Sequence, residues 1–210
     1  MADDYQKKFK IIFERERSMA QGLALSLIRP KPLTVWEIMI PVIFILNYVK
    51  IKHSREIFIQ NQMFTKKMAL DAALEMRKKE TTKETVMTQI RSKTKELVSS
   101  VPGGIYSDDI RRQQLIEIDL LIDHYSRLLN AAGKDYASLV TQVYQTAAGY
   151  SSFLEALKAA EKEVMSAARR TLGSQTDMVT AEKIESITEN MRAAEASNIF
   201  PGNSQPQDAQ

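Results

Sequence analysis

Apolar residues in the C-terminal half of the chain recur every three to four positions, a spacing that predicts amphipathic helices. One stripe follows Ser107, whose side chain can cap a helix N-terminus, and ends before Gly133. Asp108 and Asp109 add negative charge to the first turn, where the helix dipole favours it. The apolar positions of this predicted helix are Leu115, Ile118, Leu121, Ile122, Tyr125, Leu128 and Ala132.

Three further stripes predict three more helices after Gly133. The first starts at Tyr136 and is expected to end near Gly149. The next is expected to open with a capping box formed by Ser152 and Glu155, and the last covers about residues 177–197. Because the connections are short, we expect neighbouring helices to be antiparallel, in a bundle of three to four helices.

The N-terminal half is also predicted to be helical. Residues 23–102 form a run of 80 residues without glycine, rich in residues that favour helices. One amphipathic helix is expected over Asp3–Ile28 and a second, longer helix from about residue 34 to about residue 79. The sequence Arg29-Pro30-Lys31-Pro32 separates them, since a residue that precedes proline avoids the helical region. The pattern therefore predicts an apolar and amphipathic helical hairpin.

A strong turn signal, Val101-Pro102-Gly103-Gly104, divides the chain into two parts. No credible strand alternation occurs, so the predicted fold class is all-α. The expected organisation is a basic membrane-associating hairpin (1–80), a helical connector with a Pro-Gly-Gly hinge (81–104), a helical bundle (105–197) and a disordered tail (198–210).

The stretch Leu33–Ile51 stands out because it carries no charge between Ile38 and Val49. Its 19 residues would span ~28 Å as a helix, close to the ~30 Å hydrocarbon core of a bilayer. Pro41 interrupts the segment, and two polar residues within it, Glu37 and Asn47, would be candidates for function if it enters lipid. The residues predicted to contact the membrane are Trp36, Ile38, Ile40, Val42, Ile43, Phe44, Ile45, Leu46 and Tyr48.

Charge is distributed unevenly along the chain. Residues 1–80 contain 15 Lys and Arg against 9 Asp and Glu, a net charge of +6, whereas residues 81–210 have 14 against 17, a net charge of −3. Basic residues near the membrane contribute about 1 kcal/mol each to attraction by anionic lipid. Those predicted to lie at the membrane surface are Arg29, Lys31, Lys50, Lys52 and Arg55.

Three interpretations of residues 33–51 remain open: a single-pass helix, a re-entrant or interfacial hairpin, and a helix buried in protein. Positive charge on both sides gives no clear orientation for a single pass. A shallow interfacial placement with both ends on the cytoplasmic side accounts for that balance. We therefore expect a location at the cytoplasmic side of a membrane, with a purely cytoplasmic protein as the alternative.

The chain offers little evidence of chemistry. The absence of cysteine excludes disulfides and thiolate sites, and a net charge of +3 gives no indication of nucleic-acid binding. His124 lies near Glu117 and Asp119, but no metal-binding motif is present, so that helix face is interpreted as solvated, with a pair between Asp123 and Arg127. Tyr136 and Tyr144 are interpreted as core residues. We expect no enzymatic activity, metal or cofactor.

Together these features predict a membrane-associated structural or adaptor protein that presents a helical, coiled-coil-like interaction module. The expected partners are an anionic lipid surface and either a protein partner or a second copy of the chain, with no nucleic acid and no evident small-molecule substrate. The alternative is an all-helical homo-oligomer or partner-binding subunit in which residues 33–51 are buried in protein.

Overall fold

Every regular element in the described part of the chain is an α-helix, which confirms the predicted all-α class. The computed structural model describes residues 2–27, 54–100, 106–172 and 178–201. The helices in these ranges are α1 (Ala2–Leu27), α2 (Ser54–Lys78), α3 (Lys83–Ser100), α4 (Asp108–Asn130), α5 (Tyr136–Tyr144), α6 (Ala147–Leu172) and α7 (Met178–Ile199).

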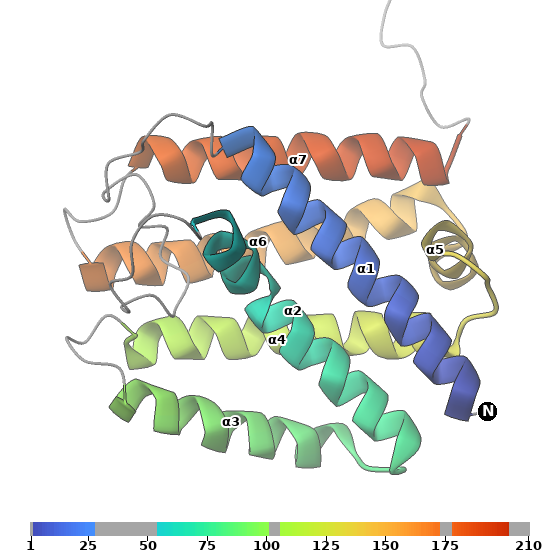
Figure 1. Ribbon diagram of the computed structural model, residues 1–210, viewed down its shortest axis with the longest axis horizontal. Helices are drawn as coiled ribbons and strands as arrows, with labels where there is room; N and C mark the ends of the chain where they lie inside the picture. Colours follow the sequence, from blue (N-terminus) through green and yellow to red (C-terminus); the bar gives the residue numbers. More distant parts are fainter. Residues whose placement is uncertain (1, 28–53, 101–105, 173–177, 202–210) are drawn as a thin grey trace, which may run out of the picture.

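The long helices of the bundle run in two different directions. In Figure 1, α3, α4, α6 and α7 run along the long axis of the molecule, while α1 and α2 cross them obliquely. Helix α4 packs against both α2 and α6, so it lies at the centre. Its buried apolar side chains are Ile110, Ile118, Leu121, Ile122, Tyr125, Leu128 and Leu129, largely the stripe that the sequence predicts.

One hydrophobic core joins the two halves of the chain. Ile12 of α1 and Leu70 of α2 belong to the same buried cluster as Ile118 of α4 and Leu157 of α6. The helices expected for residues 1–80 therefore lie directly on the bundle expected for residues 105–197. Whether the C-terminal part folds on its own stays a prediction.

A second buried cluster joins the last turns of α1 to the first turns of α2. Leu23 and Ala24 pack there with Phe58, Ile59 and Met63, and Ile184 of α7 completes the cluster. Helices α1 and α2 are therefore antiparallel, and the C-terminal end of α1 and the N-terminal end of α2 lie at one end of the bundle (Figure 1). Residues 28–53, which connect them in sequence, are outside the described residues.

The predicted start of α4 is confirmed. Ser107 is the N-cap, and its Oγ accepts a hydrogen bond from the backbone N–H of Ile110 at 3.2 Å. The helix ends at Asn130, shortly before Gly133, as expected. Helix α5 begins with a capping box that the sequence reasoning missed: Asp135 accepts from the Ser138 backbone N–H at 2.8 Å, while Ser138 Oγ accepts from the Asp135 backbone N–H.

The predicted capping box at the start of α6 is wrong. Ser152 lies inside the helix and donates a hydrogen bond from Oγ to the carbonyl oxygen of Ala148 at 3.0 Å. The chain turns earlier, at Gln145, which has a positive φ of 62°. Thr146 Oγ1 then accepts from the Gly149 backbone N–H at 3.1 Å. A threonine cap thus starts the helix, and Gly149 falls in its first turn rather than ending the preceding helix.

Candidate functional site

The residues predicted to contact a membrane fall almost entirely outside the described ranges. Only Arg55 is described, as an exposed residue in the first turn of α2. None of the helices in the described part of the chain has an apolar stretch long enough to cross a bilayer. The predicted site residues outside the described ranges are Arg29, Lys31, Trp36, Glu37, Ile38, Ile40, Val42, Ile43, Phe44, Ile45, Leu46, Asn47, Tyr48, Lys50 and Lys52.

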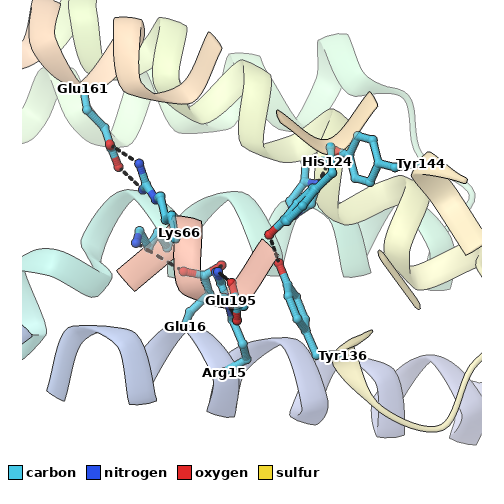
Figure 2. Close-up of polar contacts among 10 residues, drawn as sticks. Arg15, Glu16, Lys66, His124, Tyr136, Tyr144, Glu161 and Glu195 are labelled. Atoms are coloured by element: carbon cyan, nitrogen blue, oxygen red, sulfur yellow. Dashed lines mark hydrogen bonds and ion pairs between the residues drawn. The ribbon is translucent and has the colours of Figure 1, made fainter. Parts of the chain in front are cut away.

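A buried charge network lies where α1 crosses α2 and α7. Arg15 Nε donates a hydrogen bond to Glu195 Oε1 at 2.8 Å, and a second guanidinium N–H donates to the other oxygen of that carboxylate. A third N–H group donates to Glu16 Oε1 at 2.6 Å. Lys66 Nζ of α2 lies 3.2 Å from Glu16 Oε2. Figure 2 shows these four side chains converging between the helices.

The network keeps Glu16 and Arg15 ionised despite burial. Burial disfavours the charged form of Glu16, but the positive charges of Arg15 and Lys66 outweigh it and hold the pKa of that carboxyl well below its ordinary value. Burial acts against the charged form of Arg15 as well, and the carboxylate of Glu16 raises the pKa of the guanidinium. Removing one member of such a buried pair leaves an unpaired charge and typically costs about 3–5 kcal/mol.

A second polar cluster joins α4, α2 and α6. Glu117 is 5% exposed, and its Oε1 accepts a hydrogen bond from Thr65 Oγ1 at 2.7 Å. Burial, reinforced by the negative charge of Glu161, raises the pKa of Glu117 to about 7. Glu161 is ionised instead: burial opposes this, but Arg192 binds both of its oxygens at 2.7 Å and lowers the pKa of the carboxyl. Glu117 and Glu161 therefore differ in charge below pH 7.

These groups line a pocket of about 370 Å³ between α1, α2, α4, α6 and α7. Arg15, Lys66, Glu117, Glu161 and Arg192 all border it. The remaining wall includes the apolar side chains of Leu23, Val164, Met165, Ile184 and Met191. The pocket therefore offers both charged hydrogen-bonding groups and apolar surface, the usual composition of a site for a small molecule.

The interpretation of the His124 face as solvated is wrong. His124 is 3% exposed, and its ring stacks on Phe153 with the ring centroids 4.0 Å apart. Its Nδ1 lies 2.7 Å from the hydroxyl oxygen of Tyr144. Burial lowers the pKa of the imidazole to about 3, so the ring is neutral. His124 is thus a core residue.

The acidic residues around His124 have other partners than expected. Lys83 Nζ lies 3.0 Å from Asp119 and 2.8 Å from Asp123. Arg127 donates to the Val143 carbonyl oxygen at 3.2 Å rather than forming the expected pair with Asp123. In the part of the chain that is described, no three acidic or histidine side chains come together as a group that could hold a metal ion. Asp119 and Asp123, which lie four positions apart on α4, thus join α4 to the start of α3.

The tyrosine interpretation is confirmed. Tyr136 is buried in the main core, and Tyr144 is half-buried against it. The hydroxyl oxygens of Tyr136 and Tyr150 lie 3.4 Å apart, and Figure 2 places Tyr136 beside the charge network on α1. Tyr136 and Tyr150 therefore lie together on one side of the buried charge network.

Sequence reasoning missed the buried charges, although a signal for them exists. Glu16 falls on the same helical stripe as Ile12 and Leu23, and Glu117 lies beside Ile118 on the buried side of α4. A charged residue at an apolar position of a helix implies either a break in the stripe or a buried partner. The partners themselves come from other helices, up to 180 positions away in the case of Arg15 and Glu195, so the spacing within one helix does not reveal them.

Comparisons of the chain with protein-family models, with curated protein sequences and with solved structures found no match.

Proposed function

We propose that this protein attaches a helical interaction bundle to a membrane surface through residues 33–51. The observation that carries the proposal is the arrangement of the two flanking helices. Leu23 and Ala24 near the end of α1 pack against Phe58 and Ile59 near the start of α2. The two helices that flank residues 28–53 in the sequence therefore end and begin in the same packed cluster.

This arrangement favours an interfacial or re-entrant attachment over a single crossing. A segment that crosses once must deliver its two ends to opposite sides of a hydrocarbon core ~30 Å thick. Here the helices on either side of residues 28–53 meet in one packed cluster, so we propose a shallow insertion with both flanks on the same side. The basic residues on either side of the segment then face one anionic surface, which explains why the flanking charge is balanced.

Vesicle flotation tests the proposal. The full-length protein should float with vesicles of phosphatidylcholine and phosphatidylserine, more weakly with phosphatidylcholine alone, and remain at the bottom without lipid. Phe44→Glu places a charge in the middle of the apolar run and should reduce the floating fraction at least tenfold, since a charge there costs roughly 2–3 kcal/mol in lipid.

The matched control is Ile116→Glu. Ile116 is an apolar side chain that is 58% exposed on α4, so the same substitution there should leave flotation unchanged. Flotation that is equal for wild type and Phe44→Glu, or a wild-type protein that ignores both kinds of vesicle, would overturn the proposal.

The alternative of a protein partner draws support from a groove of about 580 Å³ bordered by α1, α2 and α3. Apolar residues such as Phe13, Ile59 and Ile90 and charged residues such as Arg17 and Lys93 line it. A groove with such a mixed lining can receive an amphipathic helix. Sedimentation of the lipid-free protein separates the two candidates. Stable oligomers that Phe44→Glu dissociates, together with no flotation, would favour burial of the segment in protein.

A further inference from the structure

The pocket between α1, α2, α4, α6 and α7 contains polar groups that the protein itself leaves without partners. Gln114 of α4 is 1% exposed, and its Oε1 accepts a hydrogen bond from the Tyr106 hydroxyl at 3.2 Å. Its Nε2 is buried and has no hydrogen-bond partner among the described residues. Such an orphaned donor destabilises the folded protein unless something supplies an acceptor. Gln114 borders the pocket, so an acceptor there can satisfy it.

Arg169 of α6 is the second group of this kind. Its Nε is buried without a partner among the described residues, and it borders the same pocket. The other basic residues that line the pocket each pair with a carboxylate. The pairs are Arg15 with Glu195, Lys66 with Glu16, Lys158 with Glu189, Lys162 with Glu185, and Arg192 with Glu161.

Within the described ranges, Arg169 is therefore the cation of the pocket lining that has no ion-pair partner. Most of the lining carboxylates are already engaged by the pairs above, Glu117 is held by Thr65, and Glu182 is exposed. The buried donors of the pocket lining that remain without a partner in the described part of the chain belong to the guanidinium of Arg169 and the amide of Gln114. Both recognise the oxygens of an anion, and a guanidinium binds a carboxylate with two parallel hydrogen bonds.

The packing of α4 against α6 brings these two donors to one end of the pocket. Ser107 Oγ lies 2.6 Å from Thr171 Oγ1, and Ile110 packs against Ala167 and Ala168. In this antiparallel register, position 114 of α4 lies about five residues, ~7.5 Å, from the level of position 169 along the bundle axis. Side chains in a helix tilt towards the N-terminus of their own helix, so those of Arg169 and Gln114 lean towards each other across this gap. A single head group can therefore reach both.

The rest of the pocket suits an apolar body of limited size. Leu23, Met165, Ile184 and Met191 contribute side chains to the wall, and methionine adapts readily to different shapes. A cavity of about 150 Å³ holds one benzene molecule of six carbon atoms. By that standard, 370 Å³ holds a ligand of roughly 15 non-hydrogen atoms.

We infer that this pocket binds a medium-chain organic carboxylate, with the carboxylate on Arg169 and Gln114 and the hydrocarbon chain against the apolar wall. This site is separate from the proposed attachment through residues 33–51. Dodecanoate, with 14 non-hydrogen atoms, matches the pocket in size (~15 atoms). It therefore serves as the probe for the full-length protein.

Titration calorimetry with four compounds distinguishes the contribution of the carboxylate from that of the hydrocarbon chain. Dodecanoate should bind at one site per chain, below its micelle concentration. Dodecanol, which keeps the chain but lacks the charge, should bind at least tenfold more weakly. Acetate and inorganic phosphate, which lack the chain, should give no measurable heat. Equal binding of dodecanol and dodecanoate to the wild-type protein would overturn the inference without any variant.

Two variants locate the site. Arg169→Met removes the cation while keeping an apolar stem, and should weaken dodecanoate binding at least tenfold. Arg170→Met is the matched control, because Arg170 is exposed and pairs with Asp109 on the surface. It should bind within twofold of the wild type. If Arg169→Met fails to fold, Gln114→Glu keeps the side-chain shape but repels the anion, and should weaken binding in the same way.

A third variant distinguishes this site from the proposed membrane segment. Phe44→Glu should lose flotation but bind dodecanoate as the wild type does. Loss of dodecanoate binding in Phe44→Glu, with Arg169→Met unaffected, would show that the apolar segment and not the pocket takes up the chain. That result would overturn the inference and leave the proposed attachment intact.

Discussion

Two buried titratable side chains that form no ion pair with other described residues, Glu117 and His124, respond to burial in opposite ways. Burial keeps Glu117 protonated, with a pKa of about 7 against an ordinary value of 4.5. Burial keeps His124 unprotonated, with a pKa of about 3 against an ordinary value of 6.5. Each is therefore neutral in the folded protein around pH 5–6, because the charged form is the one that burial disfavours.

The two groups have opposite effects on stability. The folded protein retains the Glu117 proton where the unfolded chain has lost it, so the stability from this group is complete below about pH 4.5 and is lost as the pH rises through 7. The stability from neutral His124 is complete above pH 6.5 and is lost as the pH falls towards 3. Between pH 4.5 and 6.5 the two contributions oppose each other, so the wild-type free energy of unfolding should depend weakly on pH there.

The substitution Glu117→Gln should remove the Glu117 contribution and so reveal the pH dependence that it cancels. The amide keeps the shape of the protonated acid and the hydrogen bond from Thr65, but it has no proton to lose. At pH 8 the variant should be more stable than the wild type by about 1–3 kcal/mol, and at pH 4 the difference should be small. Between pH 4.5 and 6.5 its stability should rise with pH, since the His124 contribution then acts alone.

Urea unfolding at half-unit pH steps measures this. Glu96→Gln is the control: Glu96 is an exposed residue of α3, and the substitution should leave the pH dependence as in the wild type. A Glu117→Gln protein that is less stable than the wild type at pH 8 would show that the cations around Glu117 stabilise its carboxylate, which contradicts a raised pKa.

At the scale of elements, the sequence predicts helices better than it predicts their ends. The stripe of α4 and the Ser107 cap could be derived because they depend on neighbouring residues alone. The start of α6 could not, because two candidate caps compete: Ser152 with Glu155 matches the capping-box pattern, while Thr146 matches no extended pattern. The turn at Gln145, with a φ of 62°, decides in favour of Thr146. The sequence does not reveal which residue other than glycine adopts a positive φ.

At the candidate sites too, only features that depend on neighbouring residues could be predicted from the sequence. The residues predicted to contact a membrane follow from a continuous apolar run, a local signal. The pocket depends on side chains from five helices, and their meeting is set by how the helices cross. The spacing of residues along α4 places Glu117 on a helix face, but it does not predict that Thr65 and Glu161 are its neighbours.

The connection between α4 and α5 is expected to tolerate no side chain at Gly133. An added Cβ would lie 2.7 Å from Ser138 Oγ and 3.0 Å from the Leu139 backbone nitrogen. Ser138 Oγ is fixed by the capping box, and the backbone of α5 cannot shift without breaking it. Gly133→Ala should therefore destabilise the protein by about 1–3 kcal/mol. Its Tm, followed by circular dichroism, should fall by about 2–10 °C.

Gly22→Ala is the contrasting variant. Its Cβ would meet the terminal methyl of Met191 at 2.7 Å, the far end of a flexible side chain that can move. Alanine also favours a helix interior over glycine by about 1 kcal/mol, so the Tm should stay level or rise. Equal losses in both variants would mean that the α4–α5 connection is as adaptable as the α1–α7 contact.

At the scale of the molecule, the main question is whether the N-terminal helices and the C-terminal bundle are separate folding units. The sequence divides them at the turn around residues 101–104, where local signals are strongest. Packing joins them, because α4 contributes side chains to a core that α1 and α2 also fill. A turn signal in the sequence carries no information about which helix faces pack together on either side of it.

A fragment of residues 105–210 tests the division. Without α1 and α2, the buried side chains of Ile118, Leu121 and Leu128 lose one side of their packing. Each fully buried aliphatic side chain contributes roughly 1.5–3 kcal/mol by its burial, while a whole domain is stable by only about 5–15 kcal/mol. Losing part of that contribution at several positions should leave the fragment helical but without a cooperative unfolding transition. Adding a peptide of residues 54–100 should restore cooperativity, since α2 packs directly on α4. A fragment that unfolds cooperatively by itself would instead establish residues 105–197 as an independent domain, with the N-terminal hairpin docked on a finished core.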